Sequence, residues 1–262
     1  MPHSFDPARC AEFLNDARLS RVPFENIPEA FSPLNVEEAY IAQAAYNLAR
    51  HGAGAKPAGL KIATTTRVMQ ALVGIDHPCH GRIFASEVHE SGAEIDSGRW
   101  VALKLECEIA LRLDAEIPAG SGHTAASVRA FAAAAMPAFE LLDDRRSDYR
   151  QLKATSLIAD NCWNDVVVLG PETPLSGGRG LAGLTGRLNN GSSGNSGSLE
   201  GLSDDPFEAL AWLANTAGAR EPVLRKGMIV ITGSIIPTQP VLAGQTYRFE
   251  IGGLGSVEMT GR

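Results

Sequence analysis

The stretch RWVALKLECEIALRL, from Arg99 to Leu113, alternates strictly between two kinds of side chain. Every second residue is apolar, whereas the intervening positions include Lys104, Glu106 and Glu108. A period of two over this length predicts a long β-strand with one face on an apolar core. The two glutamates therefore point to the same side of the strand, away from that core.

The carboxylates of Glu106 and Glu108 are expected about 6.5–7 Å apart along the strand, from the rise of two residues. That spacing suits two oxygen ligands of one hard cation such as Mg²⁺. Acids on the outer face of a strand are more often simply solvated, so spacing alone does not establish a metal site. Glu140, on a second strand-like run, could complete the set. No His-x-x-x-His and no Cys pair accompanies these acids, which favours Mg²⁺, Mn²⁺ or Ca²⁺ over Zn²⁺.

Composition and charge exclude several classes of protein. The 262 residues are 44% hydrophobic and 20% charged, as in an ordinary globular chain. A net charge of -7 argues against nucleic acid as a partner. The N-terminus has no apolar signal core, residues 227–244 are too polar for a membrane span, and the four cysteines are widely spaced. We therefore expect a cytoplasmic protein with free thiols and no membrane partner.

Helical patterns come first in the chain and strand patterns follow. This order predicts an α+β fold with a helical N-terminal subdomain over residues 1–57 and a β-rich catalytic domain over residues 58–262. Thr124 is expected to cap an Ala-rich helix that continues to Met136, where Pro137 stops it. The Gly-, Ser- and Asn-rich segment 176–198 is expected to form a flexible hairpin or loop.

Six short motifs, in order along nearly the whole chain, resemble those of 2-keto-4-pentenoate hydratases, a family of the fumarylacetoacetate hydrolase superfamily. The motifs are Gly59-Leu-Lys-Ile62, Glu106-Cys-Glu108, Pro137-Ala-Phe-Glu-Leu-Leu-Asp-Asp-Arg145, Ala159-Asp-Asn161, Trp212-Leu-Ala-Asn215 and Thr232-Gly-Ser234. Any one of them is weak, but six in order are specific. The resemblance implies a mixed β-roll core and usually a homo-oligomer.

The resemblance also implies a divalent-metal-dependent hydratase that adds water to an unsaturated 2-oxo acid in aromatic-compound catabolism. It implies Mg²⁺ or Mn²⁺ held by Glu106, Glu108 and Glu140. Further site residues follow from the matched motifs and their neighbours. Lys61, His80 and Asp143 are the expected catalytic residues, and Asn161, Thr232 and Gly233 are expected to bind substrate.

The chain departs from the family pattern beside the expected site. Cys79 stands where hydratases usually carry an acid that could help to place water, and Cys162 and Trp163 follow Asn161 where small residues are usual. His80 could replace the missing acid, or it could be a structural histidine beside a glycine turn.

These departures leave three alternatives open. A decarboxylase of a 4-oxalocrotonate-like diacid would need the same metal site and no placed water. A C–C hydrolase or acylpyruvase is less favoured, because none of the six histidines is followed three residues later by Glu. A non-catalytic partner subunit is also less favoured, because all three acids are retained.

Overall fold

The computed structural model describes residues 3–118, 120–175, 180–192, 195–217 and 224–262. Its helices are α1 (Pro7–Leu19), α2 (Val36–His51), α3 (Arg67–Val73), α4 (Ala125–Val128), α5 (Ala154–Ala159) and α6 (Pro206–Ala217). Its strands are β1 (Pro57–Ala63), β2 (Cys79–Phe84), β3 (Val88–Glu90), β4 (Ala93–Ile95), β5 (Leu103–Leu113), β6 (Ala132–Asp143), β7 (Asn164–Leu169), β8 (Thr173–Pro174), β9 (Thr185–Ser192), β10 (Asn195–Leu202), β11 (Ile229–Ile231), β12 (Ile236–Pro240), β13 (Thr246–Ile251) and β14 (Gly255–Gly261).

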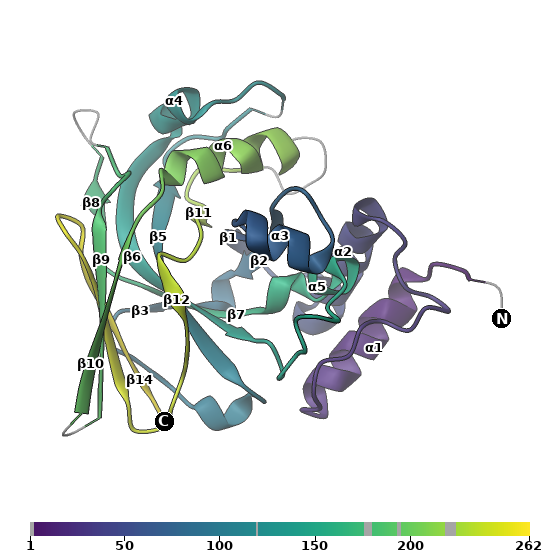
Figure 1. Cartoon of the computed structure of the whole chain (residues 1–262). Coiled ribbons are helices and arrows are strands. Elements are labelled where there is room, and N and C mark those ends of the chain that lie inside the picture. The colour runs from purple at the N-terminus through teal and green to yellow at the C-terminus, as the bar shows by residue number, and fades with distance from the viewer. Residues whose placement is uncertain (1–2, 119, 176–179, 193–194, 218–223) are drawn as a thin grey trace.

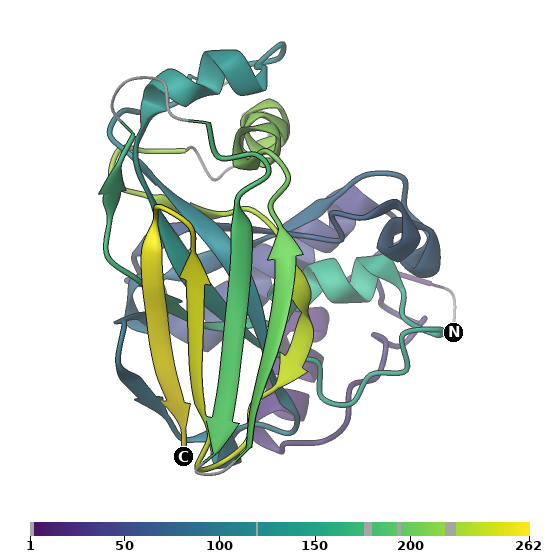
Figure 2. The ribbon, with the colours of Figure 1, turned by 60° about the vertical axis from the view of Figure 1, so that its left-hand side comes forward.

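The described strands form two sheets. The larger has the order β2-β1-β11-β5-β6-β7-β3, with β12 joined to β5 and β8 joined to β6, and it mixes parallel and antiparallel pairs. The smaller has the order β10-β9-β13-β14-β4. Figure 2 shows the smaller sheet in front of the larger one, with α6 above both. This arrangement confirms the predicted α+β architecture and its mixed β-sheet core.

The main core lies between the two sheets. The apolar face of β5, represented by Leu105, Cys107 and Leu111, packs against Phe249 and Met259 of the smaller sheet. All five side chains are at most 1% exposed. The strict alternation of the sequence therefore reflects a strand with one face on the apolar core, as predicted. The same alternation places Glu106 and Glu108 on the opposite side of the sheet.

Helices cover that opposite side. Figure 1 shows α1, α2 and α5 on the side of the larger sheet that faces away from the smaller one. The Gln43 side chain of α2 donates to the carbonyls of His80 in β2 and Ile158 in α5, at 2.9 and 2.8 Å. The first helices are thereby fixed to segments far along the chain.

The predicted helix from Thr124 to Met136 is wrong over most of its length. The helix α4 ends at Val128, a 3₁₀ turn follows over Arg129–Phe131, and Ala132 begins the long strand β6. Pairing with β5 along the whole strand outweighs the helical preference of the alanines. The predicted hairpin within 176–198 is confirmed in part, since β9 pairs with β10, while residues 176–179 and 193–194 lie outside the described part of the chain.

The boundary between residues 57 and 58 stays a prediction, as do the cytoplasmic location and the homo-oligomer. The strand β1 begins at Pro57, close to that boundary, yet Ala159 of α5 packs in one cluster with α1 and α2. All four cysteines are free and buried. Within the described ranges, no helix combines the length and the apolar character that crossing a membrane requires.

Candidate active site

Three glutamates meet on the helix-covered face of the larger sheet. Glu106 of β5 lies directly opposite Glu140 of β6 in the antiparallel register, and Glu108 follows two residues later on the same face. One carboxylate oxygen from each lies within 4.8 Å of the others. The strand register therefore brings together the three acids that the sequence predicts as metal ligands.

Burial makes this cluster costly without a cation. Glu108 and Glu140 are fully buried, and no described residue provides a hydrogen-bond partner for Oε1 of Glu108 or Oε2 of Glu140. The pKa of Glu108 is raised well above its usual range, first by burial and then by Glu140 and Glu106. Burial likewise raises the pKa of Glu140. Buried carboxylate oxygens without donors fit a hard divalent cation, which relieves their repulsion and completes their coordination.

Lys61 is the basic partner of this cluster. Its Nζ lies 2.6 Å from Oε1 of Glu140, and both side chains are almost completely buried. Burial opposes the charge on Lys61, but the attraction of Glu140 outweighs it and raises the pKa of Lys61 above its usual range. The ion pair links β1 to β6 on the polar face of the larger sheet. Nothing in the local sequence links Lys61 to Glu140, so only the fold reveals this ion pair.

Neighbouring groups orient the carboxylates. The backbone N–H of Gly233 donates to Oε2 of Glu108 at 2.7 Å, and the Thr238 hydroxyl donates to Oε1 of Glu106 at 2.7 Å. Gly233 has φ of +109°, a conformation that favours glycine, so its N–H can be aimed at the carboxylate without strain. Gly233 therefore contacts a candidate metal ligand, although its predicted role was substrate binding.

A cavity of about 610 Å³ opens beside the cluster. Lys61 and Glu106 line it, together with polar residues of the β1–α3 loop and apolar residues from α5, β6 and the β11–β12 segment. The full lining is Lys61, Ile62, Ala63, Thr64, Thr65, Thr66, Met69, Lys104, Glu106, Leu142, Tyr149, Leu152, Leu157, Cys162, Trp163, Gly233, Ser234, Ile235, Ile236, Pro237 and Thr238. A space of this size admits a small organic acid beside the acids and the lysine.

His80 and Asp143 are not brought to this cavity. His80 is not among the lining residues, and its ring stacks on Tyr40 of α2 with ring centroids 4.3 Å apart. The Asp143 carboxylate accepts hydrogen bonds from the backbone of Val101, Ala102 and Arg145. These hydrogen bonds connect the end of β6 to the residues that precede β5. Catalytic roles for both residues stay predictions, and their contacts are structural.

Asn161 and Thr232 also make structural contacts. The Asn161 side chain accepts from the backbone N–H of Arg82 at 2.7 Å and donates to the Arg82 carbonyl at 2.9 Å. The Thr232 hydroxyl donates to the carbonyl of Ile109 at 2.9 Å. Neither residue lines the 610 Å³ cavity, whereas Gly233 does. Substrate binding by Asn161 and Thr232 stays a prediction.

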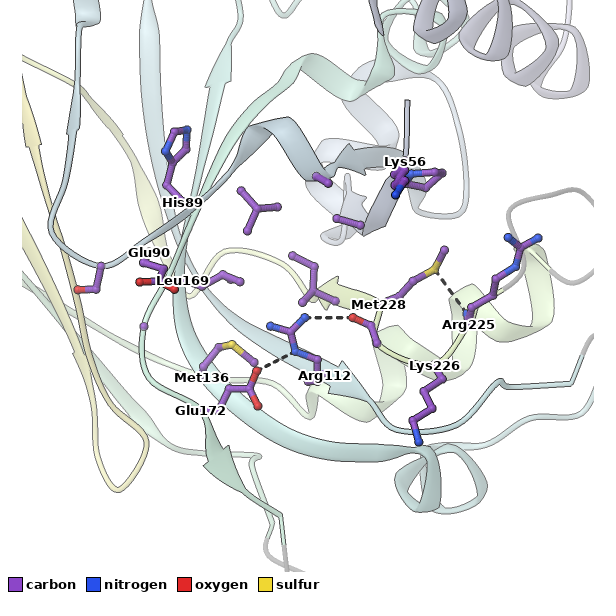
Figure 3. A pocket seen from close by; sticks show the side chains of 18 of the residues that line it. Lys56, His89, Glu90, Arg112, Met136, Leu169, Glu172, Arg225, Lys226 and Met228 are labelled. Carbon is purple, nitrogen blue, oxygen red and sulfur yellow. Dashed lines mark hydrogen bonds and ion pairs between the residues drawn. The ribbon is translucent and has the colours of Figure 1, made fainter. Parts of the chain in front are cut away.

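A larger cavity, about 1070 Å³, lies farther along the same face of the larger sheet. Figure 3 shows Arg112 at its centre, donating to Glu172 and to the carbonyl of Gly227. Lys56, Arg225 and Lys226 also line it. None of the three clustered glutamates does so, and we place the candidate active site at the smaller cavity for that reason.

Known proteins with similar sequences include hydratases. The chain is 30% identical to the 2-hydroxyhexa-2,4-dienoate hydratase of Comamonas testosteroni over 251 residues, which cover 95% of this chain and 93% of that protein. It is 32% identical to the 2-keto-4-pentenoate hydratase of Burkholderia vietnamiensis strain G4 over 223 residues, covering 85% and 84%. No protein-family model matches the chain.

Solved structures with a similar fold include metal complexes. The 4-oxalocrotonate decarboxylase of Pseudomonas putida G7, complexed with magnesium and adipate, superposes with a TM-score of 0.88 over all of both chains, at 23% identity. The fumarylpyruvate hydrolase of Pseudomonas aeruginosa, in complex with Mn²⁺ and pyruvate, gives 0.56 at 14% identity, covering 77% of this chain and 87% of that one. At these identities the likeness concerns the fold.

Proposed function

Because the chain belongs to the 2-keto-4-pentenoate hydratase family, we propose that it is a hydro-lyase that adds water to a small 2-hydroxy-dienoate with the help of a divalent metal ion. The observation that carries this proposal is the cluster of Glu106, Glu108 and Glu140 with Lys61 at the edge of the 610 Å³ cavity. We propose Mg²⁺ as the metal, since three carboxylates are a hard, all-oxygen donor set.

The three glutamates would hold the cation, with Gly233 and Thr238 fixing two of them. When bound, a divalent cation supplies positive charge that stabilises an enolate at the 2-oxo-acid end of the substrate. Apolar side chains such as Leu142 and Trp163 line the rest of the cavity and surround the unsaturated chain.

Lys61 is suited to the proton transfer. Its protonated Nζ is anchored by Glu140 and lines the cavity. The dienol must lose its hydroxyl proton and gain a proton on carbon before water adds at C4. A lysine ammonium held at this place delivers that proton, or it stabilises the enolate oxygen by its charge.

Product identification tests the reaction. Purified protein with Mg²⁺ should consume 2-hydroxypenta-2,4-dienoate, seen as loss of dienol absorbance, and release 4-hydroxy-2-oxopentanoate. The Glu106→Gln, Glu108→Gln double variant should stay folded and lose both Mg²⁺ binding and turnover. Binding of Mg²⁺ by calorimetry that is unchanged in this variant would refute the metal site, whatever the substrate.

A decarboxylase of a 2-oxo diacid is the second candidate. Among the described residues that line the 610 Å³ cavity, Glu106 is the only carboxylate and there is no histidine. A reaction that needs no placed water suits such a lining. Release of CO₂ from a 4-oxalocrotonate-like diacid, without turnover of the dienoate, would replace the hydratase proposal with this one.

A further inference from the structure

Two cysteines lie side by side in the wall of the candidate active site. Cys79 begins β2, and Cys162 lies in the 3₁₀ turn Asn161–Trp163. Their Sγ atoms are 3.6 Å apart, and the two residues are 0% and 2% exposed. Cys162 lines the 610 Å³ cavity together with Lys61, whereas Cys79 is not among the lining residues. Cys162 therefore borders the cavity, and the sulfur of Cys79 lies in contact with it.

The segments that carry the two sulfurs are firmly joined. The Asn161 side chain holds both backbone groups of Arg82 in β2, at 2.7 and 2.9 Å. A Cβ on Gly81 would lie 2.5 Å from the Asn161 carbonyl, so β2 and the turn are in close contact between the cysteines. A disulfide has a sulfur–sulfur distance of about 2.05 Å, so the sulfurs need to approach by only about 1.6 Å.

The turn itself is strained. Asn161, Cys162 and Trp163 have φ of 53°, 50° and 62°, three successive left-handed residues without a glycine. Such conformations cost free energy and persist only where the surroundings fix them. Here the contacts with β2 hold the turn and aim Cys162 at Cys79.

The surroundings also favour a thiolate within the pair. A hydrogen bond from the Cys162 thiol lowers the pKa of Cys79, with the Thr64 hydroxyl and the charge of Lys61 acting in the same direction against burial. Burial and the same hydrogen bond raise the pKa of Cys162 well above its usual range, so the proton of the pair lies on Cys162 and the negative charge on Cys79. Thiolates, and not thiols, react with peroxides.

We propose that Cys79 and Cys162 are an oxidation site, at which a peroxide closes a disulfide in the wall of the active site. As its proton passes along the hydrogen bond to Cys79, the Cys162 sulfur attacks one oxygen of hydrogen peroxide. The O–O bond breaks, and the released hydroxide takes that proton from Cys79 and leaves as water. The sulfur of Cys79 then attacks the sulfenic sulfur of Cys162. The S–S bond forms, the S–OH bond breaks, and the departing hydroxide takes up the proton that the pair released to solvent when its thiolate formed. Two thiols and one peroxide therefore give one disulfide and two waters.

Closing the disulfide changes the cavity wall. Thr64 contacts Cys79 at 3.4 Å between Oγ1 and Sγ, has φ of 54°, and lines the cavity. Movement of Cys79 toward Cys162 breaks this contact and shifts Cys162 away from its place beside Lys61. Displacements of this size at a reacting centre lower turnover by about tenfold or more. The disulfide therefore makes the enzyme less active under oxidising conditions.

Mass spectrometry tests the site without reference to activity. The full-length protein, treated with a small excess of hydrogen peroxide and alkylated without reduction, should lose two of its four free thiols and 2 Da in mass. Peptide mapping should give one cross-linked pair that contains Cys79 and Cys162. Cys10 and Cys107 are internal controls: neither is among the described residues that line the 610 Å³ cavity, and both should stay reduced.

Single variants separate disulfide formation from other oxidation. Cys79→Ser should leave a sulfenic acid on Cys162 that dimedone labels, with no loss of two thiols. Cys162→Ser should leave Cys79 reduced, because Cys79 does not line the cavity. In the wild-type protein, dithiothreitol should restore the mass and the lost turnover. Four retained thiols, a cross-link through Cys10 or Cys107, or a sulfinic acid on Cys162 without a cross-link would each overturn the proposal.

Discussion

Lys61 and Glu140 show how single residues set the charge of the site. The lysine is paired with the same carboxylate that is expected to bind a cation, at 2.6 Å and out of contact with water. The Glu140 carboxylate therefore has two partners, the Lys61 ammonium and the expected metal ion. The role of Lys61 can be separated from that of the glutamates because only the glutamates provide oxygen ligands.

Replacing Lys61 by Met should lower turnover by about 10² to 10⁴-fold, the usual contribution of a proton-transfer group. Mg²⁺ affinity should be retained or increased, because a neighbouring positive charge is removed from the cluster. Calorimetry and steady-state kinetics measure the two effects on the same sample. The matched control is Lys153→Met, an exposed lysine paired with Glu29 on the surface, which should leave both quantities unchanged. Full activity in Lys61→Met would exclude Lys61 from the chemistry.

At the residue scale the sequence predicted well wherever strand periodicity decides the outcome. The common face of Glu106 and Glu108 follows from alternation, and the structure confirms it. The role expected for Asn161 came from motif matching, and the role expected for His80 came from a position where the chain departs from the family motif. Their actual contacts depend on neighbours from distant segments, such as Tyr40 for His80 and Arg82 for Asn161, which no local pattern reveals.

Among the elements, β1 carries Lys61 and packs closely against β11. A Cβ added to Gly59 would lie 1.9 Å from the carbonyl oxygen of Ile229, its partner in the parallel register. Gly59→Ala should therefore lower the free energy of unfolding by about 3 kcal/mol, as overpacking against backbone does. Gly54→Ala, where no atom lies within 4 Å, should change it by less than about 0.5 kcal/mol. Urea unfolding of both variants checks this, and equal stabilities would contradict it.

The contact between the end of α2 and the turn after β2 contains two titrating groups of opposite behaviour. Burial, followed by the charges of Arg50 and Arg18, lowers the pKa of His51 to about 4. Burial raises the pKa of Glu87 to about 7 against the attraction of Arg50. Between about pH 4 and 6.5 the unfolded chain binds a proton at His51 that the fold does not, so this contribution to stability is lost as pH falls. The protonated Glu87 stabilises the fold fully below about pH 4.5, and this contribution to stability is lost as pH rises toward 7.

Replacing one of the two residues should therefore reveal how the other makes the free energy of unfolding depend on pH. Relative to the wild-type protein, Glu87→Gln should become less stable by about 1–2 kcal/mol on acidification from pH 7 to pH 4.5, and His51→Gln should show the reverse trend. Chemical unfolding at several pH values measures the difference. A difference that does not vary with pH in either variant would contradict the assignment.

The wrongly predicted helix over Ala132–Met136 is an error about a secondary-structure element. Alanine favours helices when only neighbouring residues are considered, and a proline such as Pro137 commonly follows the end of a helix. In the fold, Met136 and Pro137 lie opposite Ala110 and Ile109 of β5, in a strand whose pairing extends as far as Asp143. Long-range pairing decided this element, and a local pattern could not contain that information.

For the whole molecule, metal binding should be visible as stability. A ligand that binds only the folded chain adds about 2.7 kcal/mol at a concentration 100 times its Kd, a rise of about 5–10 °C in Tm for a chain of this size. Mg²⁺ should produce such a rise, and EDTA should reverse it. In Glu108→Gln the rise should disappear, while the metal-free variant should melt above the metal-free wild type, because a buried repulsion is removed.

Glu172→Gln is the control for this experiment. Glu172 pairs with Arg112 in the larger cavity and is half-exposed, so this variant should keep the full rise in Tm with Mg²⁺. An equal rise in Glu108→Gln and Glu172→Gln would contradict a metal site at Glu108. A rise in neither variant would show that the loss is not specific to the cluster.

The direct pairing of Glu106 with Glu140 determines where the length of this chain is free to change. One residue inserted into β5 between Glu106 and Glu108 reverses the faces of one part of the strand relative to the other and sends one of the two carboxylates toward the apolar core. The connection 114–131 lies beyond the last paired residues, and its segment Gly120–Gly122 is exposed. Insertions and deletions there leave every strand pair in place. A label, an affinity tag or a fused domain is therefore best introduced at this segment, where it adds length without changing the register of the acids.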